Sequence, residues 1–421
     1  MPVQINVNEL NPGMRLADNI IYNYQIVLPH GHTLTEKNIS FLAGKFPNES
    51  FPVDMPNLEG VVDFEDLPEK KISTKTAEEL RQNMSSVSQK TTSMMHNVLN
   101  LSAEQMRELD ETISEMLRFI QENPLTINIL EKFNVCHEYL QSHGMNVLNY
   151  SLLLAYAIQD IVREHQETSG GRQISGSATS FSPLATAAIF HDIGMIPIQN
   201  LYDKTDPITE EEKKSIKAHP LVSVELLPDG INPAVLDAVL HHHENYDGTG
   251  YMKGIKGDEL NAFARILRIA DAFATATTNK AYGKSKNTIT VLYEMTHGDY
   301  RNCYDPALAN LFASKIQPFP IGAKIKLNNG QWAVVVRHNQ KNPFKPQIII
   351  AFDEQGNPLP KSQLKKPFLP DQRSDIEFVS FNKMDLTFLN KPIPDISLTE
   401  HYNRIAKTYR EISDNCVSVA S

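Results

Sequence analysis

The chain has 421 residues and a mass of 47.4 kDa, a length that favours roughly two to four compact domains over a single one. Hydrophobic residues make up 41% and charged residues 21%, values that are ordinary for a globular protein and exclude disorder as the main state. Acidic residues outnumber basic residues 50 to 40, so the net charge of -10 argues against a dedicated duplex-DNA-binding protein.

Cysteine usage and hydropathy indicate a reducing compartment. Cys136, Cys303 and Cys416 are widely spaced and odd in number, so neither a disulfide framework nor a cysteine-rich zinc site is expected. The N-terminus lacks the basic and apolar stretches of a signal peptide. The longest nearly apolar run, residues 150–158, is about half of what a membrane span requires. A cytoplasmic protein without a transmembrane segment is therefore expected.

The first two segments differ in composition. Residues 1–66 mix short apolar runs with turn residues, which predicts a small α+β domain with a strand over 24–28 and a helix over 34–46, entered at Thr35. Residues 67–120 are rich in polar side chains and methionine, with apolar residues at helical spacing. This pattern predicts a helical connector that packs on its neighbour or on a second copy of the chain.

The remaining residues divide where the hydrophobic period changes. Residues 121–316 are persistently helical, apart from a Gly- and Ser-rich stretch at 168–182 that we expect to be a mobile surface loop. Residues 317–421 begin with alternating runs around Asn-Asn-Gly at 328–330, a strong hairpin pattern, and end in a polar helix near 398–412. The predicted fold is multidomain: an all-α core, preceded by the α+β domain and its connector and followed by a β-rich domain.

Nine of the 14 histidines fall between residues 137 and 297, and the helical core also carries acids in apolar surroundings. A lone histidine such as His143 is more often a core residue than a ligand. The pair His191-Asp192 is different, because it ends an apolar helix, and Asp271 lies in another. Burying these carboxylates is costly unless a cation pairs with them. A divalent metal held by carboxylates and imidazoles, without thiolate, fits Fe, Mn, Zn or Co.

These motifs, in this order, resemble the HD phosphohydrolase superfamily and, within it, the HD-GYP family of bacterial cyclic-dinucleotide phosphodiesterases. His191-Asp192 matches the HD pair, and residues 242–251, HHENYDGTGY, resemble the HHExxDGxGYP signature. The resemblance covers about residues 123–312, nearly half of the chain. The flanking segments resemble the small N-terminal domain and the C-terminal β extension that often accompany this family.

The resemblance implies metal-dependent hydrolysis of cyclic di-GMP, or a related cyclic dinucleotide, to linear pGpG and on to GMP. It implies two divalent ions, Fe or Mn with Zn, Co and Ni as alternatives, with Asp192 as the bridging ligand and catalytic roles for His191 and Asp192. Some members hold a third metal through a Glu one turn before the first His; Tyr139 stands there, so two metals are predicted. The positions that match the family's ligands are His143, His191, Asp192, His219, His242, His243 and Asp271.

The chain departs from the family at substrate-facing positions. Met195 replaces the Lys of HDIGK, Met252 replaces the Pro of GYP, and Asn245 replaces the Arg after HHE. The basic segment keeps Lys280 but loses both arginines. A lysine restored at Met195 would raise turnover, unless Met195 packs on an apolar wall and another cation has taken over. The expected substrate contacts are Lys204, Arg265, Lys280 and the position of Met195.

Three functions are open at this point. The first is a cyclic-dinucleotide phosphodiesterase, which the complete ligand set favours. The second is a catalytically degenerate HD-GYP protein that acts as a nucleotide sensor or protein-interaction module, which the lost cations favour. The third is a phosphohydrolase of another nucleotide. The expected partners are cyclic di-GMP or a relative of it and signalling proteins such as diguanylate cyclases; duplex nucleic acid is not expected, and the connector is compatible with a homodimer.

Overall fold

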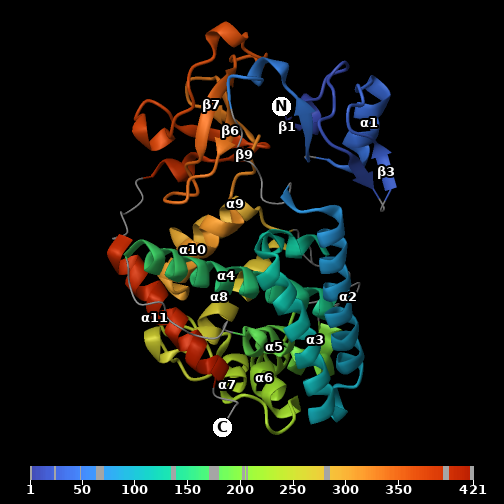
Figure 1. Cartoon of the computed structure of the whole chain (residues 1–421), viewed down its shortest axis with the longest axis vertical. Coiled ribbons are helices and arrows are strands. Elements are labelled where there is room, and N and C mark those ends of the chain that lie inside the picture. Colours follow the sequence, from blue (N-terminus) through green and yellow to red (C-terminus); the bar gives the residue numbers. More distant parts are fainter. Residues whose placement is uncertain are drawn as a thin grey trace. The chain divides into compact units, whose positions relative to one another are not determined.

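Figure 1 shows the computed structural model of the chain. It describes residues 2–22, 25–47, 49–62, 71–133, 139–169, 180–201, 204, 207–278, 285–391 and 398–417. The chain divides into two compact units, one formed by Met1–Asp66 with Ile316–Pro394 and the other by Leu67–Lys315 with Asp395–Ser421. The four consecutive segments predicted from the sequence stay a prediction. Among the described residues, no helix has the length and apolar character that a membrane span needs.

The described residues of the first unit form three antiparallel sheets, and the sheet predicted for the C-terminal part of the chain is confirmed. Strand β1 (Pro2–Asn6) pairs with β4 (Ser50–Asp54), and β2 (Ile20–Tyr22) pairs with β3 (Gln25–Leu28). Helix α1 (Glu36–Lys45) begins after Thr35, whose side chain accepts the N–H of Asn38. The third sheet has the order β7-β6-β5-β8-β9, with the bounds β5 (Lys324–Leu327), β6 (Trp332–Arg337), β7 (Gln347–Phe352), β8 (Phe378–Phe381) and β9 (Met384–Asp385).

The core of this unit joins segments that are distant in sequence. Val3 and Ile5 of β1 belong to one cluster of buried residues with Val334 of β6 and Ile349 of β7. The N–H of Gln4 donates to the carbonyl of Gly322 at 2.8 Å. The N-terminal and β-rich segments therefore share one core, which is why they form one unit.

The second unit is helical, which confirms the predicted all-α core. Capping residues begin several helices: Ser102 accepts the N–H of Gln105 at the start of α3, and Thr209 accepts that of Glu212 at the start of α6. Residues 170–179, most of the predicted mobile loop, lie outside the described residues. The helices are α2 (Thr74–His96), α3 (Ala103–Glu122), α4 (Tyr139–Ser169), α5 (Ser182–Phe190), α6 (Glu210–Leu226), α7 (Pro233–His241), α8 (Ala262–Thr277), α9 (Thr288–Thr296), α10 (Pro306–Ile316) and α11 (Leu398–Val417).

Helices α4, α5, α7 and α8 form the centre of this unit. Helix α4 packs on both α5 and α8, and α7 packs on α5, α6 and α8. Nearly every residue of α5 is buried, as its uniformly apolar sequence predicts. The ends and faces of these four helices carry the histidines and acids that the sequence singled out.

Helix α11 follows the β-rich segment in the chain but packs on the helical unit. It contacts α4, α5 and α8, and Ile405 and Ile412 are fully buried there. Polar contacts also hold it: Lys407 pairs with Asp258 at 2.7 Å, and Arg404 with Asp305 at 3.3 Å. The last helix thus completes the core of the helical unit.

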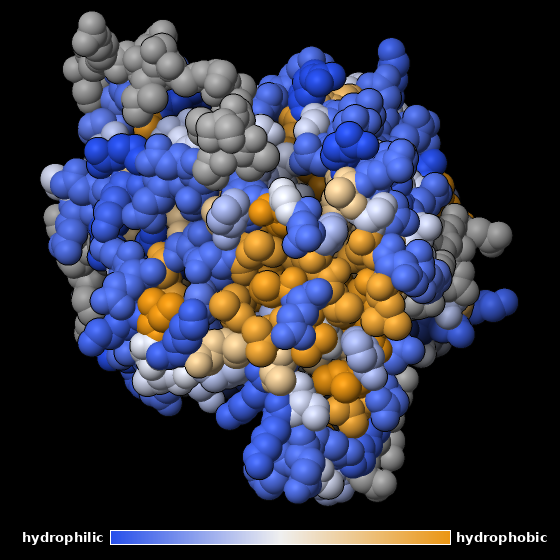
Figure 2. Space-filling view, turned by 90° about the horizontal axis from the view of Figure 1, so that it is seen from below, coloured by the Kyte–Doolittle hydropathy of each residue, from blue (hydrophilic) through white to orange (hydrophobic). Residues whose placement is uncertain are grey.

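The surface is not uniformly polar. Figure 2 shows, on the face seen from below, a broad area of hydrophobic side chains surrounded by hydrophilic ones. Exposed apolar areas often mark interaction surfaces. The large apolar side chains that are exposed in the helical unit are Leu99, Leu125, Ile208, Leu221 and Tyr300.

Candidate metal centre

The pair His191-Asp192 lies on the turn that follows α5 and leads into a short 3-10 segment, η6 (Ile193–Leu201). His191 is fully buried, and the Asp192 side chain is 16% exposed. Because α5 is apolar on all sides, its end delivers these two polar side chains into the middle of the helical unit. A carboxylate in such a position needs a counter-charge.

Asp192 presents one carboxylate oxygen to each of two groups of imidazoles. Its Oδ2 lies 3.4 Å from the Nε2 of His191 and 3.6 Å from that of His143. Its Oδ1 lies 3.0 Å from the Nε2 of His219 and 3.5 Å from that of His242. The carboxylate therefore stands between the two groups, as a bridging ligand must.

The potential ligand atoms form two clusters that share Asp192. One contains His143, His191 and Asp192, and the other contains Asp192, His219, His242 and His243; within each, the atoms lie within 4.8 Å of one another. The residues come from α4, the end of α5, α6 and the end of α7. Segments spread over a hundred residues of sequence thus converge on one carboxylate.

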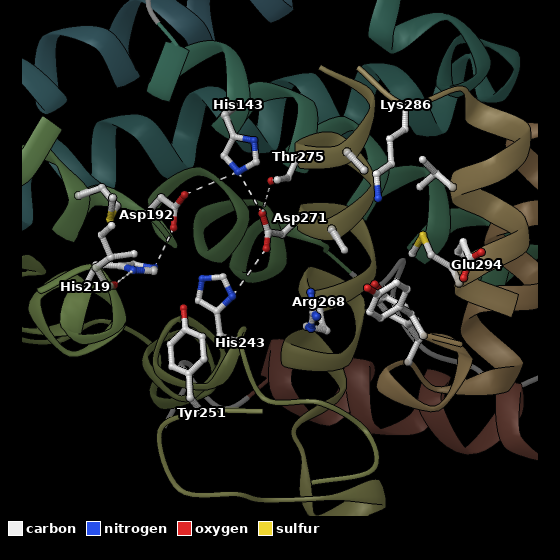
Figure 3. A pocket seen from close by; sticks show the side chains of 18 of the residues that line it. His143, Asp192, His219, His243, Tyr251, Arg268, Asp271, Thr275, Lys286 and Glu294 are labelled. Carbon is white, nitrogen blue, oxygen red and sulfur yellow. Dashed lines mark hydrogen bonds and ion pairs between the residues drawn. The ribbon is translucent and has the colours of Figure 1, made fainter. Parts of the chain in front are cut away.

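Asp271 of α8 lies on the other side of His143, as Figure 3 shows. Its Oδ1 is 3.1 Å from the Nε2 of His143, and its Oδ2 is 3.9 Å from the Nδ1 of His243. The hydroxyl of Thr275, one turn further along α8, donates to Oδ1 at 3.1 Å. All seven predicted ligand residues therefore meet at this site.

Three of the imidazoles are oriented in the same way. The Nδ1 atoms of His191, His219 and His242 lie 2.9, 2.6 and 2.7 Å from the carbonyl three residues earlier. A carbonyl can only accept, so each Nδ1 carries a proton and each Nε2 points toward Asp192, where the neutral imidazole would offer its lone pair to a cation. Metal-binding histidines are commonly fixed by this kind of contact.

The pKa values show how the acids stay ionised. Burial disfavours the charged form of Asp192, but the positive charge of His191, whose Nε2 lies 3.4 Å away, outweighs it and holds the pKa of Asp192 well below the usual range. Burial likewise acts against the ionised form of Asp271, yet neighbouring imidazoles lower its pKa. Burial would lower the pKa of His191, but the charge of Asp192 raises it to about 9. Burial lowers the pKa of His242 and His243.

The donor set fits a divalent metal centre. The Nε2 of His191 and the Oδ1 of Asp192 are fully buried, and neither makes a hydrogen bond of acceptable geometry within the described part of the chain. A bound cation would satisfy both atoms. Imidazole nitrogens with carboxylate oxygens are ligands that Fe, Mn, Zn and Co accept. His241 is not part of this set, since its Nδ1 bonds to Asp237 at 2.9 Å.

A pocket of about 490 Å³ opens beside the cluster. One wall is formed by the candidate ligands, and the remainder is mostly apolar and aromatic, with a few charged groups (Figure 3). Its size and character are typical of small-molecule sites. Besides His143, Asp192, His219, His243 and Asp271, the lining includes Met195, Leu201, Ile208, Ile216, Tyr251, Arg268, Thr275, Lys286, Val291, Glu294, Met295, Tyr300 and Tyr304.

The four predicted substrate contacts are placed differently. Met195 lines the pocket and is 4% exposed. Lys204 is not in the lining and pairs with Glu212 at 2.7 Å. Lys280 lies outside the described residues. The side chain of Tyr139, on which the prediction of two metals rather than three depended, also lies outside the described part of the chain.

Arg265, predicted as a substrate contact, lies elsewhere in the structure. Its side chain is 2% exposed and lies outside the pocket lining. The guanidinium pairs with Asp305 at 2.7 Å and with Glu411 of α11. Its charge is therefore used to attach α11 and α10 to α8, and we do not retain it as a substrate contact.

Sequence reasoning missed two cations, Arg268 and Lys286, that line the pocket among the described residues. Arg268 is half-buried on α8, and Lys286 is exposed just before α9. Helical spacing could have identified Arg268, because it precedes Asp271 by three residues and so shares its face of the helix. No pattern near Lys286 marked it; the hydrogen bond from its backbone N–H to the carbonyl of Ala276, 2.8 Å, places it.

The segment after His243 forms a tight loop against the ligands. Glu244 is buried, and its Oε1 accepts the backbone N–H groups of Lys253 and Gly254 at 2.5 and 2.9 Å. The ring of Tyr251 stacks on His243 with centroids 4.8 Å apart. Met252, which follows Tyr251 and precedes Lys253 in the chain, has a φ of 122°, a conformation that proline cannot adopt.

Comparisons with known proteins agree with this geometry. A family model described as an HD domain matches residues 150–308, and one described as a KOW domain associated with HD domain matches residues 324–366. The chain is 24% identical over 260 residues to the cyclic di-GMP phosphodiesterase PA4108 of Pseudomonas aeruginosa, covering 60% of this chain and 57% of that protein.

Two further relatives match shorter stretches. The cyclic di-GMP phosphodiesterase PdeB of Borreliella burgdorferi is 29% identical over 167 residues, which are 39% of this chain and 44% of that protein. The 3'3'-cGAMP-specific phosphodiesterase 3 of Vibrio cholerae is 33% identical over 114 residues, 26% of this chain and 25% of that protein. The chain thus spans about half the length, or less, of these curated relatives.

Proposed function

Because the chain belongs to the HD-GYP family of HD-domain proteins, we propose that it is a metal-dependent phosphodiesterase that hydrolyses cyclic di-GMP or a related cyclic dinucleotide in second-messenger signalling. The observation that carries the proposal is the position of Asp192. Its two oxygens face two separate groups of imidazoles, an arrangement that suits two metal ions about one bridging carboxylate.

The residues that would hold the ions divide between the two clusters. His143, His191 and Asp271 would hold one, His219, His242 and His243 the other, and Asp192 both. The chemistry that divalent ions supply at such a centre is activation of water at neutral pH and neutralisation of phosphate charge. Two ions rather than three fit the described ligands, and Fe or Mn are the ions that we propose.

Hydrogen bonds to backbone carbonyls and to Glu244 fix the orientation of the imidazole rings and of the loop after His243. The backbone carbonyls behind His191, His219 and His242 fix which ring nitrogen faces inward. The buried Glu244 anchors the following loop through two backbone N–H groups, and the loop carries Tyr251 over His243. These contacts hold the imidazoles in place before a ligand arrives, so little reorganisation is needed during the reaction.

The pocket supports a nucleotide substrate. Its volume of about 490 Å³ is in the range of sites for drug-sized molecules. Tyr300 offers an aromatic face on which a base can stack, and Val291 and Met295 of α9 add apolar surface to the lining. A cyclic dinucleotide presents phosphodiesters and flat bases, and the pocket offers a surface for each.

Turnover of defined substrates tests the proposal. The chain is purified anaerobically, its metals are counted by elemental analysis, and products formed from cyclic di-GMP, from the mixed cyclic GMP-AMP and from cyclic di-AMP are separated by chromatography. We expect a linear dinucleotide from at least one guanine-containing substrate. A fully metal-loaded chain that cleaves none of the three would contradict the proposal and favour a nucleotide-sensing or protein-interaction role.

A further inference from the structure

Arg268 is a cation on the pocket wall whose charge is not neutralised by any carboxylate in the described part of the chain. Its Nε–H donates to the Oδ1 of Asn245 at 2.9 Å, and its guanidinium lies 5.2 Å from the ring centre of Tyr304. A guanidinium has five N–H donors. The other four make no hydrogen bond to a described residue, although the side chain lines the pocket.

Arg265, one turn earlier on the same helix, shows the opposite arrangement. It is buried, it pairs with Asp305 and Glu411, and it does not reach the pocket. The two arginines of α8 therefore differ: Arg265 forms ion pairs within the fold, whereas Arg268 has N–H donors that are available to a ligand.

The position of Arg268 indicates which part of a ligand it meets. It precedes Asp271 by three residues, so both side chains project from the same face of α8. Figure 3 shows the guanidinium beside Asp271 and His243, on the side of the cluster that faces Glu294. A phosphodiester that reaches the cluster therefore comes within range of this fork.

We infer that Arg268 binds the non-bridging phosphate oxygens of the substrate, an assignment that rests on the proposed function. A planar fork with parallel N–H groups matches two phosphate oxygens, which gives a charge-assisted and oriented contact. Asn245 and Tyr304 pre-position the guanidinium through its Nε and its face, and thus leave its outer edge for the phosphate.

The same contact accounts for two departures from the family pattern. Position 195, where the family has a lysine, carries an uncharged Met195 in the pocket wall. Position 245, where the family has an arginine, carries an amide whose oxygen accepts from Arg268. A second guanidinium at 245 would place two like charges within contact distance. In this chain the guanidinium that lines the pocket is therefore carried by α8 and not by the loop or the turn.

Kinetics on three substrates test the inference with the metal-loaded full chain. Arg268→Ala is expected to lower kcat/KM about ten- to a hundredfold on cyclic di-GMP, on the mixed cyclic GMP-AMP and on the simple diester bis(4-nitrophenyl) phosphate, with metal content unchanged. Arg268→Lys, which keeps the charge but loses the fork, should recover part of the loss. Arg163→Ala removes an exposed arginine of α4 that pairs with Asp160 at 2.9 Å, and it serves as the matched control without effect.

The pattern of losses separates the alternatives. A loss confined to guanine-containing substrates would overturn the phosphate assignment in favour of base recognition. Asn245→Ala keeps the guanidinium but removes its Nε contact, so it should cost less than Arg268→Ala. An Arg268→Ala variant with unchanged kcat/KM on all three substrates would overturn the inference. If wild type cleaved the simple diester but no cyclic dinucleotide, the proposed function would fail, and Arg268 could still be judged on the diester. Inactivity toward all three would overturn both.

Discussion

The hydroxyl of Ser223, on α6, links that helix to the turn that carries His191 and Gly194. Its Oγ accepts the N–H of Gly194 and donates to the carbonyl of His191, each at 2.8 Å. The approach is so close that a Cβ atom at Gly194 would lie 2.2 Å from the carbonyl oxygen of His219. The glycine therefore allows α6 to bring His219 up to Asp192.

Gly194→Ala should separate α6 from the turn. Because the clash is with backbone, the helix has to shift, and we expect a loss of about 1–3 kcal/mol in the free energy of unfolding together with weaker metal binding. Thermal melts and metal titration measure both. Gly44→Ala is the control, since nothing lies within 4 Å of a Cβ there. An alanine at 194 that melted and bound metal like wild type would show that the close approach is dispensable.

The ligand set could be predicted from the sequence, and the reason is local. His191-Asp192 and His242-His243 are adjacent pairs, each at the end of an apolar helix, so their helices had to bring them to the same interior. The role of Arg265 could not be predicted in this way. Its partner Glu411 is 146 residues further along, on a helix that follows the β-rich segment. Helical spacing relative to Asp271 could have favoured Arg268, but nothing near Arg265 in sequence indicates that its charge is used to hold a distant helix.

Met252→Pro is expected to damage the loop although it restores the residue of the family signature. Proline fixes φ near −65°, whereas Met252 has a φ of 122°, so the loop would have to refold. We expect lower turnover and a lower melting temperature, because the anchors from Glu244 to the next two residues would be lost. Met252→Gly accepts a positive φ and should retain both properties. A proline variant as stable and active as wild type would disprove this account of the loop.

Met195→Lys is expected to leave kcat/KM on cyclic di-GMP unchanged or lower it. Met195 is buried in a pocket lining that is mostly apolar, so a charge there would be desolvated. The sequence alone allowed the opposite result, a gain from a restored cation. Steady-state kinetics with metal content measured in parallel decides the matter. A tenfold gain would show that the phosphate passes Met195 and lacks a cation there.

The pKa of His191 predicts how the metal-free protein responds to pH. Burial lowers this pKa, but Asp192 raises it from 6.5 to about 9 in the folded state. The protonated imidazole therefore stabilises the fold fully below about pH 6.5, and this stabilisation is lost as the pH rises through 9. Melting temperatures of chelator-treated protein should fall across that window, and Mn²⁺ should restore more stability at pH 9 than at pH 6. A His191→Gln variant should lack the effect; a flat profile in wild type would contradict it.

The most direct test of the central claim is the metal content of Asp192→Ala beside that of wild type. Elemental analysis of anaerobically purified chains is combined with product chromatography on cyclic di-GMP, with Arg163→Ala as the control. Because Asp192 faces both groups of imidazoles, we predict two metals per chain and hydrolysis in wild type, and the loss of most metal and all hydrolysis in Asp192→Ala. A variant that kept its full metal content would contradict the assignment of Asp192 as the ligand shared by both ions.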